Sequence, residues 1–250
     1  MEISLIESMF INLPHFQKHG YQAGEWCSKH DTHTLYQYTC QVYPAMALYL
    51  AKRLPSLYSS LDTGYHGVWH GISVAGDASR LMMDFGCNRK GEITAFLAGL
   101  FHDAGYVINR PSERNVNMAA EIFRKEASFE NPMTKVMKSH SISVKTVQKA
   151  ILCTQFNLAD STYPVPPTTQ VEMALRDADL LTFTSSKWPW MFKGLMLEHG
   201  LDPNDWNDCR RALESHYHFL LANKPFTEHD YIKKSRNDYL GTLCMLLMDI

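Results

Sequence analysis

Four side chains able to bind a metal lie in apolar, helix-like stretches: His70, the adjacent pair His102 and Asp103, and Asp179. Burying an imidazole or a carboxylate costs several kcal/mol unless the group is paired or holds a metal. Two imidazole nitrogens and two carboxylates form a ligand set suited to Zn, Fe, Mn or Co. The four residues therefore predict a metal site. A hydrogen-bonded core histidine is the alternative for His70 alone, and helix capping is the alternative for the His102–Asp103 pair.

Helical spacing of apolar residues accounts for where these side chains lie. Residues 93–101 repeat apolar side chains at the helical period, which predicts a strongly buried helix that ends at the His102–Asp103 pair, just before Gly105. The same spacing predicts further helices over residues 43–50, 72–83, 112–123, 144–152, 171–181 and 239–247. Strand signals are nearly absent, and the clearest breaks fall at residues 160–169 and 185–208. The sequence therefore predicts one all-α domain spanning residues 1–250.

Two further spacings bear on the predicted site. His66 lies four residues before His70, so a helix through both would direct the two imidazoles to the same face. Asp177 and Asp179 are two apart, so on a helix their side chains point about 200° from each other. We expect Asp179 to face the core, and Asp177 to pair with a base or with solvent.

Composition narrows the class of protein. The chain has 250 residues, 45% hydrophobic and 20% charged, with a formal net charge of −2 and no block of Lys or Arg, which argues against a nucleic-acid binder. Six cysteines without a CxxC spacing indicate reduced core thiols. The first residues, MEISLIESMF, do not resemble a signal peptide, and no stretch approaches the roughly 20 apolar residues of a membrane span. A cytoplasmic protein with no membrane partner is expected.

Three motifs carry a resemblance to a known family. In order along the chain they are YHGVWH at residues 65–70, FHDAGY at residues 101–106 and DADLL at residues 177–181. This ordered set resembles the HD-domain metal-dependent phosphohydrolase superfamily. Within it, the first motif is nearest to that of the cyclic-nucleotide phosphodiesterases. The resemblance implies a helical bundle of the HD type, with a metal-binding core at about residues 63–185. N-terminal helices within residues 1–60 and C-terminal helices within residues 205–250 would pack on this core.

The resemblance also implies roles for individual residues. His70, His102, Asp103 and Asp179 would bind one metal ion, which could be Zn, Fe, Mn or Ni. Asp103 would also bridge to a second ion, for which Mg or Mn would suit. His66 stands in the position of the family's proton donor, so it would be the general acid, and Asp103 would share the catalytic work through the metal. Hydroxide bridging the metals would attack a small phosphoester, such as a nucleotide or a cyclic nucleotide.

The chain departs from the phosphodiesterase pattern in ways that affect the substrate more than the metal. Gly67 replaces an asparagine, the HDAGY motif lacks a following Asp and His, and no counterpart of the purine-reading glutamine is found. Di-iron oxygenases and cyclic-di-GMP hydrolases of this superfamily supply two extra histidines between the second and third motifs, whereas this chain has only His140 there. The deoxynucleotide triphosphohydrolases begin with an Arg-containing motif that is absent here. Hydrolysis with four protein ligands is therefore favoured over oxygenation.

Three residues are weaker candidates for contact with the substrate or support of the site. Glu113 could orient a metal-bound water, and a solvated acid in a first helical turn is the alternative. His140 could touch the site or lie at the surface. Lys187, beside a cluster of aromatic residues, could contact a phosphate, with core or lid packing as the alternative.

The leading hypothesis is a metal-dependent phosphohydrolase acting on a small phosphorylated substrate. A phosphomonoesterase acting on nucleoside monophosphates is the second enzyme hypothesis. The non-enzymatic hypothesis is a sensor of the same fold that holds metal and ligand without turnover. His66 distinguishes an enzyme from a sensor, because a protein that only binds its ligand needs no imidazole one helical turn from the metal. Its presence favours catalysis. The sequence leaves the oligomeric state open.

Overall fold

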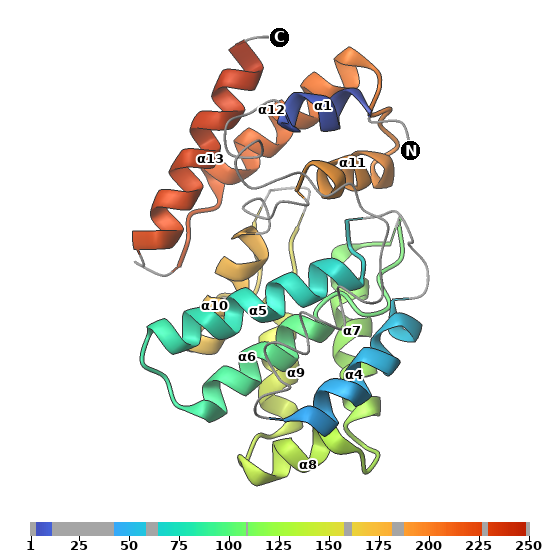
Figure 1. Cartoon of the computed structure of the whole chain (residues 1–250), viewed down its shortest axis with the longest axis vertical. Helices are drawn as coiled ribbons and strands as arrows, with labels where there is room; N and C mark the ends of the chain where they lie inside the picture. Colours follow the sequence, from blue (N-terminus) through green and yellow to red (C-terminus); the bar gives the residue numbers. More distant parts are fainter. Residues whose placement is uncertain are drawn as a thin grey trace. The chain divides into compact units, whose positions relative to one another are not determined.

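A computed structural model describes residues 4–11, 43–58, 65–108, 110–157, 162–181, 188–226 and 230–248. These residues form eleven α-helices (Figure 1): α1 Leu5–Ile11, α4 Pro44–Leu57, α5 Val68–Asp84, α6 Arg89–Phe101, α7 Ser112–Glu126, α8 Pro132–Ser139, α9 Val144–Leu152, α10 Gln170–Leu180, α11 Trp188–Glu198, α12 Trp206–Ala222 and α13 Asp230–Met248. Within the described ranges the extended backbone is limited to one isolated bridge, between Asn157 and Thr162. The all-α prediction is confirmed.

Several helices differ from their predicted extents, and α8 was not predicted at all. The spacing predicted a terminal helix over residues 239–247, but α13 begins at Asp230, because its first half is polar and carries no apolar signal. A break was predicted over residues 185–208, but α11 lies within it. Most of α11 is apolar, and seven of its eleven residues are buried, so its sequence lacks the alternation of polar and apolar faces that marks a surface helix.

The chain divides into two compact units. One comprises residues 26–62 and 66–180, and the other comprises residues 1–25, 63–65 and 181–250. The three sequence motifs fall mainly in the first unit, which we call the motif unit; the second is called the terminal unit. Whether residues 1–250 form a single domain stays a prediction.

In the motif unit, α5, α6 and α10 pack against one another, and Figure 1 shows α5 and α6 side by side. Every residue of α6 from Glu92 to Phe101 is buried, as the apolar spacing predicted. At Gly99 the two helices approach so closely that an added Cβ would lie 2.6 Å from Ala75 Cα and 2.7 Å from Ala75 N. A glycine is required there because backbone atoms leave no space for a side chain.

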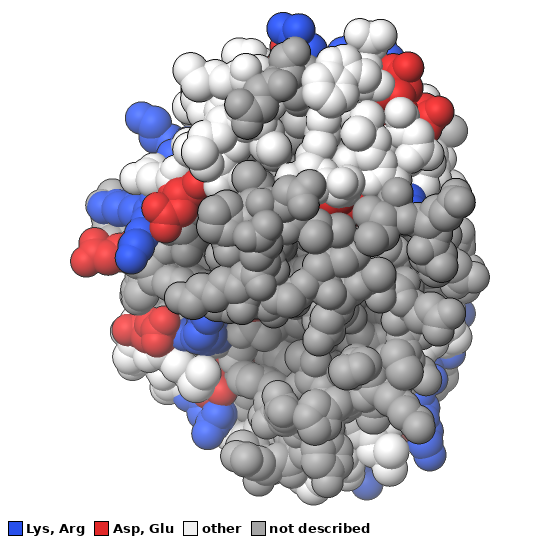
Figure 2. Space-filling model, turned by 45° about the horizontal axis from the view of Figure 1, so that its top comes forward, with Lys and Arg blue, Asp and Glu red and all other residues white. Residues whose placement is uncertain are grey.

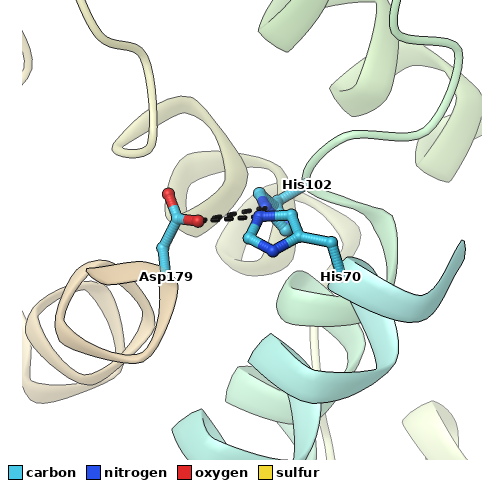
Figure 3. A group of neighbouring side chains, drawn as sticks. All are labelled: His70, His102 and Asp179. Atoms are coloured by element: carbon cyan, nitrogen blue, oxygen red, sulfur yellow. Dashed lines mark hydrogen bonds and ion pairs between the residues drawn. The ribbon is translucent and has the colours of Figure 1, made fainter. Parts of the chain in front are cut away.

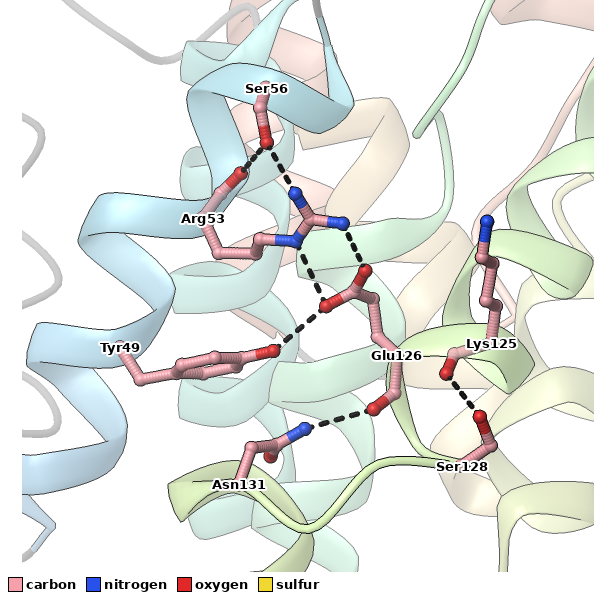
Figure 4. Close-up of polar contacts among 7 residues, drawn as sticks. All are labelled: Tyr49, Arg53, Ser56, Lys125, Glu126, Ser128 and Asn131. Carbon is pink, nitrogen blue, oxygen red and sulfur yellow. Dashed lines mark hydrogen bonds and ion pairs between the residues drawn. The ribbon is translucent and has the colours of Figure 1, made fainter.

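A polar cluster fixes α4 against α7 (Figure 4). The buried carboxylate of Glu126 accepts hydrogen bonds from the Tyr49 hydroxyl at 2.8 Å and from Arg53 Nε at 3.0 Å and Nη2 at 2.5 Å. The Asn131 amide donates to the Glu126 backbone carbonyl at 2.9 Å.

The helix α4 also continues through Pro55 to Leu57, beyond the predicted segment. Pro55 has no N–H to donate to the preceding turn, so the helix passes through it with one backbone hydrogen bond fewer.

In the terminal unit, an aromatic cluster joins α11, α12 and α13. The Trp188 indole N–H donates to the Tyr239 hydroxyl at 2.6 Å. His216 of α12 lies in the same cluster, with its ring centroid 5.3 Å from Trp188, 5.5 Å from Phe192 and 5.7 Å from Tyr239. The His216 side chain is partly buried, but its Nε2 is sealed from solvent and makes no hydrogen bond within the described part of the chain.

This environment predicts a loss of stability in mild acid. Burial lowers the pKa of His216 from 6.5 to about 3, so between these values the unfolded chain binds a proton that the folded chain rejects. The free energy of unfolding should therefore fall as the pH drops below 6.5, by about 2 kcal/mol between pH 7 and pH 5 from this residue alone. Urea unfolding of the wild type and of His216→Phe at both pH values measures this difference. Equal pH dependence of the two proteins would contradict it.

Exposed acidic and basic side chains lie beside one another on the face drawn in Figure 2. Typical exposed pairs are Arg124–Glu121 at 2.7 Å and Arg210–Glu214 at 2.9 Å. Such exposed pairs contribute little to stability, and they balance the charge of the surface locally.

Among the described helices, none combines the length and the apolar character needed to cross a membrane.

Candidate metal centre

Three potential ligand atoms from three helices meet in the motif unit (Figure 3). His70 lies in the first turn of α5, His102 directly follows α6, and Asp179 lies at the end of α10. Their donor atoms all lie within 4.8 Å of one another. Asp179 Oδ1 is 2.9 Å from His70 Nε2 and 3.6 Å from His102 Nε2, and the two Nε2 atoms are 3.2 Å apart. His70, His102 and Asp179 could therefore hold a metal ion.

Asp103 adds a carboxylate oxygen beside the same imidazoles. Its Oδ2 lies 3.0 Å from His102 Nε2 and 3.4 Å from His70 Nε2. This oxygen is buried, yet it accepts no well-oriented hydrogen bond from the described residues. A buried acceptor without a hydrogen bond is costly, and a cation removes that cost.

The separations of the donor atoms fit a coordination shell. Ligands at about 2.0–2.1 Å from a tetrahedral ion lie roughly 3.3 Å from one another. Within the group of His70, His102 and Asp179 the separations are 2.9, 3.2 and 3.6 Å. Asp103 Oδ2 lies 3.0 and 3.4 Å from the two imidazole nitrogens, but Asp103 does not belong to the group whose donor atoms all lie within 4.8 Å of one another. In addition, two imidazole nitrogens that face each other at 3.2 Å repel unless a proton or a cation lies between them. The residues therefore fit a bound metal ion.

The charges around the cluster also fit a bound cation. Asp103, Asp177 and Asp179 are three acidic side chains in or near the interior, and the adjacent permanent cation in the described residues is Arg176, which is 2% exposed and interacts electrostatically with Asp177 and Asp179. With both imidazoles neutral, as metal ligands must be, the three carboxylates carry more negative charge than Arg176 alone balances. A bound cation would offset this excess.

A backbone hydrogen bond selects the tautomer of His102. Its Nδ1 lies 2.8 Å from the carbonyl oxygen of Gly99. A carbonyl oxygen can only accept, so Nδ1 carries a hydrogen and donates it, which leaves the lone pair of the neutral ring on Nε2. Nε2 is the atom that faces His70 and the carboxylates. The end of α6 thus presents an imidazole in the form that binds metals. The hydrogen bond from its other ring nitrogen to a backbone carbonyl is one that metal-binding histidines commonly make.

The electrostatics of the cluster favour a positive charge at its centre. Burial alone would lower the pKa of His102, but the carboxylates of Asp103 and Asp179 outweigh burial and raise it well above its usual value. Burial alone would raise the pKa of Asp179, but the imidazoles of His102 and His70 hold it below its usual range. Both carboxylates therefore stay ionised around the imidazoles.

His66 lies beside this group but does not belong to the mutually close donor set. Its ring centroid is 6.1 Å from that of His70, with the ring planes at 83°. The prediction that a helix carries both histidines is wrong, because α5 begins at Val68 and His66 lies in the turn before Gly67, which caps the helix. The two imidazoles still lie near each other, because the turn and the first helical turn adjoin.

Asp177 was expected to pair with a base or with solvent, and its burial excludes solvent. Its side chain is fully buried, at 0% exposure, whereas the Asp179 side chain is 19% exposed. Residues 174–178 of α10 are all buried, so Asp177 is covered although it lies only two residues from Asp179. Arg176, stacked at 3.5 Å over the Tyr163 ring, provides the basic neighbour that was expected for Asp177.

The weaker candidates lie elsewhere or cannot be placed. Glu113 is exposed in the first turn of α7. His140 follows α8, and its Nε2 lies 2.5 Å from the Tyr43 hydroxyl. Within the described residues no hydrogen bond or ion pair joins Glu113 or His140 to the four predicted ligands. Lys187 lies outside the described residues, and its predicted role stays a prediction.

Tyr106 was not singled out from the sequence. Its ring stacks on His66, with centroids 3.9 Å apart and planes at 10°. No local spacing could indicate this contact, because the two residues come from different motifs and neither lies in a regular helix. The only available signal was the position of Tyr106 directly after the His102–Asp103 turn.

No model of a known protein family matches the chain, and no curated protein matches it significantly.

Proposed function

We propose that this protein is a metal-dependent phosphohydrolase that cleaves a small phosphoester, with His66 as the general acid. The observation that carries the proposal is the convergence of His70, His102 and Asp179 within 4.8 Å of one another, with the His66 imidazole beside them. The resemblance of the three motifs to HD-domain phosphohydrolases, in the same order along the chain, supports the same conclusion.

The residues would have two roles, metal binding and proton donation. His70, His102, Asp103 and Asp179 would hold the ion, and the bond from His102 to Gly99 keeps that imidazole in its binding form. A divalent ion held there would neutralise phosphoryl charge and lower the pKa of a coordinated water. Burial alone would raise the pKa of Asp103, but the nearby imidazoles of His102, His66 and His70 lower it, so Asp103 stays anionic close to His66.

His66 would supply the proton that the leaving group needs. An alkoxide or phenolate leaving a phosphoester is a strong base, and protonation by a positioned imidazole typically contributes about 10²–10⁴-fold to the rate. Because His66 is not part of the donor group, proton transfer would not require a ligand to leave the metal. A small phosphodiester or phosphomonoester, including a nucleotide, fits this chemistry. The type of ester is decided by a substrate panel.

The proposal predicts a selective defect in His66→Ala. The variant should bind metal like the wild type but lose about 10²–10⁴-fold in kcat on phenyl phosphate or diphenyl phosphate, whose phenolate needs a proton. The loss should be much smaller on the 4-nitrophenyl analogues, because nitrophenolate leaves without one. Initial rates on both pairs of esters, with metal content measured in parallel, test this.

The matched control is His218→Ala, which removes an exposed imidazole from α12. It should leave the rates and the metal content unchanged. Unchanged hydrolysis of the phenyl esters by His66→Ala would remove His66 from the mechanism. Metal binding without hydrolysis of any phosphoester by the wild type would favour a sensor over an enzyme.

A further inference from the structure

The face-to-face contact between His66 and Tyr106 links a residue of the first motif to the end of the second. Their ring centroids are 3.9 Å apart, with planes 10° from parallel. Both residues belong to the motif unit. We propose that Tyr106 is a positioning residue that fixes the plane of the His66 imidazole beside the metal centre. This inference rests on the proposed role of His66 as general acid.

Backbone hydrogen bonds fix the chain at Tyr106 and at the residue before it. Its N–H donates to the Asp103 carbonyl at 3.0 Å, which closes the turn after the His102–Asp103 pair. The preceding residue, Gly105, has a φ of +76°, which favours glycine, and its N–H donates to the Leu57 carbonyl at 3.0 Å. The backbone of Tyr106 is therefore tied to the turn that carries His102 and Asp103, two of the proposed metal ligands.

Val107, the residue after Tyr106, is held by the buried side-chain amide of Asn115. Asn115 of α7 is 3% exposed, and its side chain accepts a hydrogen bond from Val107 N–H at 3.0 Å and donates one to the Val107 carbonyl at 3.2 Å. These two hydrogen bonds hold the chain directly after Tyr106 against α7. Tyr106 is thus anchored at the residue before it, at its own amide and at the residue after it.

His66 lies outside the helix that carries His70. It lies in a turn, and α5 begins only at Val68. The terminal torsion of a histidine is broad, so contacts with neighbouring groups decide the plane of the ring. A general acid must be held within about 0.5 Å and 10–20° of its productive geometry. The stack on an anchored Tyr106 ring supplies that restraint, and it needs an aromatic ring rather than the hydroxyl.

The first test observes the stack itself, in metal-free protein and without any substrate. Stacking on an aromatic ring shifts the ring protons of the partner upfield, so the His66 imidazole protons, assigned by their loss in His66→Ala, should be upfield of those of an exposed histidine. Tyr106→Phe should retain this NMR shift, and Tyr106→Leu should lose it. An unshifted His66 in the wild type, or the same shift in Tyr106→Leu, would overturn the inference.

The second test separates positioning from general packing through the leaving group. Tyr106→Leu should lose at least ~10-fold in kcat on diphenyl or phenyl phosphate but much less on the 4-nitrophenyl analogues, with unchanged metal content, while Tyr106→Phe should match the wild type. Equal losses on both classes of ester would overturn the positioning role and leave the role of His66 intact. If His66→Ala itself loses nothing on the phenyl esters, the proposed function fails and this inference with it.

Discussion

Replacing His102 by alanine is expected to abolish tight metal binding. The imidazole is 1% exposed, and its Nε2 lies within 3.6 Å of three other potential donor atoms. Losing even a residue that only supports a ligand typically weakens metal affinity about 10–100-fold, so the loss of a ligand should weaken it by more than ~100-fold. Titration of the metal-free protein with Zn²⁺ or Mn²⁺, followed by calorimetry, measures the change.

The same substitution should remove the stabilisation that metal provides. An ion at 100 times its dissociation constant stabilises the folded state by about 2.7 kcal/mol, or roughly 5–10 °C in melting temperature for a protein of this size. The wild type and His218→Ala should show this shift when metal is added, and His102→Ala should not.

A second variant guards against a folding defect in His102→Ala. Asp179→Asn keeps the volume and hydrogen-bonding ability of the side chain but removes the charge of the ligand oxygen, which lies 2.9 Å from His70 Nε2. It should fold like the wild type and bind metal at least ~100-fold more weakly. Wild-type affinity in both variants would contradict the assignment of the donor group.

Replacing Gly99 by alanine is expected to damage both the fold and the site. The added methyl would lie 2.6 Å from Ala75 Cα and 2.7 Å from Ala75 N, and these backbone atoms cannot move aside as the tip of a side chain can. Separating α5 from α6 would also separate His70 from His102. We expect a loss of about 1–3 kcal/mol in the free energy of unfolding, together with weaker metal binding.

Gly76→Ala in α5 is the matched control. A methyl group there meets no described atom within 4 Å. Alanine favours the helix over glycine by up to about 1 kcal/mol, so this variant should be as stable as the wild type or slightly more stable. Urea unfolding and zinc titration of the two variants give both readouts. Equal stability of Gly99→Ala and Gly76→Ala would contradict the close approach of the two helices.

Sequence periodicity was sufficient for the class of fold because the helices carry strong apolar patterns. The buried helix α6, which ends at the His102–Asp103 pair, is the clearest case. The pattern was less informative where a helix is uniformly apolar or uniformly polar along part of its length. Accordingly α11 and the first half of α13 were not predicted.

The four potential ligands were recognisable because polar residues in apolar helices stand out. Their surroundings were not, since they depend on contacts between distant segments. The tautomer of His102 depends on the Gly99 carbonyl, the burial of Asp177 on the packing around α10, and the orientation of His66 on Tyr106. The expected helical pairing of His66 with His70 was wrong because α5 begins only at Val68, after its cap residue Gly67, and His66 lies in the turn before it.

Metal stoichiometry in the wild-type protein tests the central claim most directly. The protein is stripped with a chelator, incubated separately with Zn²⁺, Mn²⁺, Fe²⁺ and Ni²⁺, freed of excess ion and subjected to elemental analysis, with Asp179→Asn treated in parallel. We predict at least one equivalent of one of these ions per wild-type chain and less than a tenth of that in the variant. The absence of any retained ion in the wild type, or equal retention by both proteins, would contradict a metal centre at His70, His102 and Asp179.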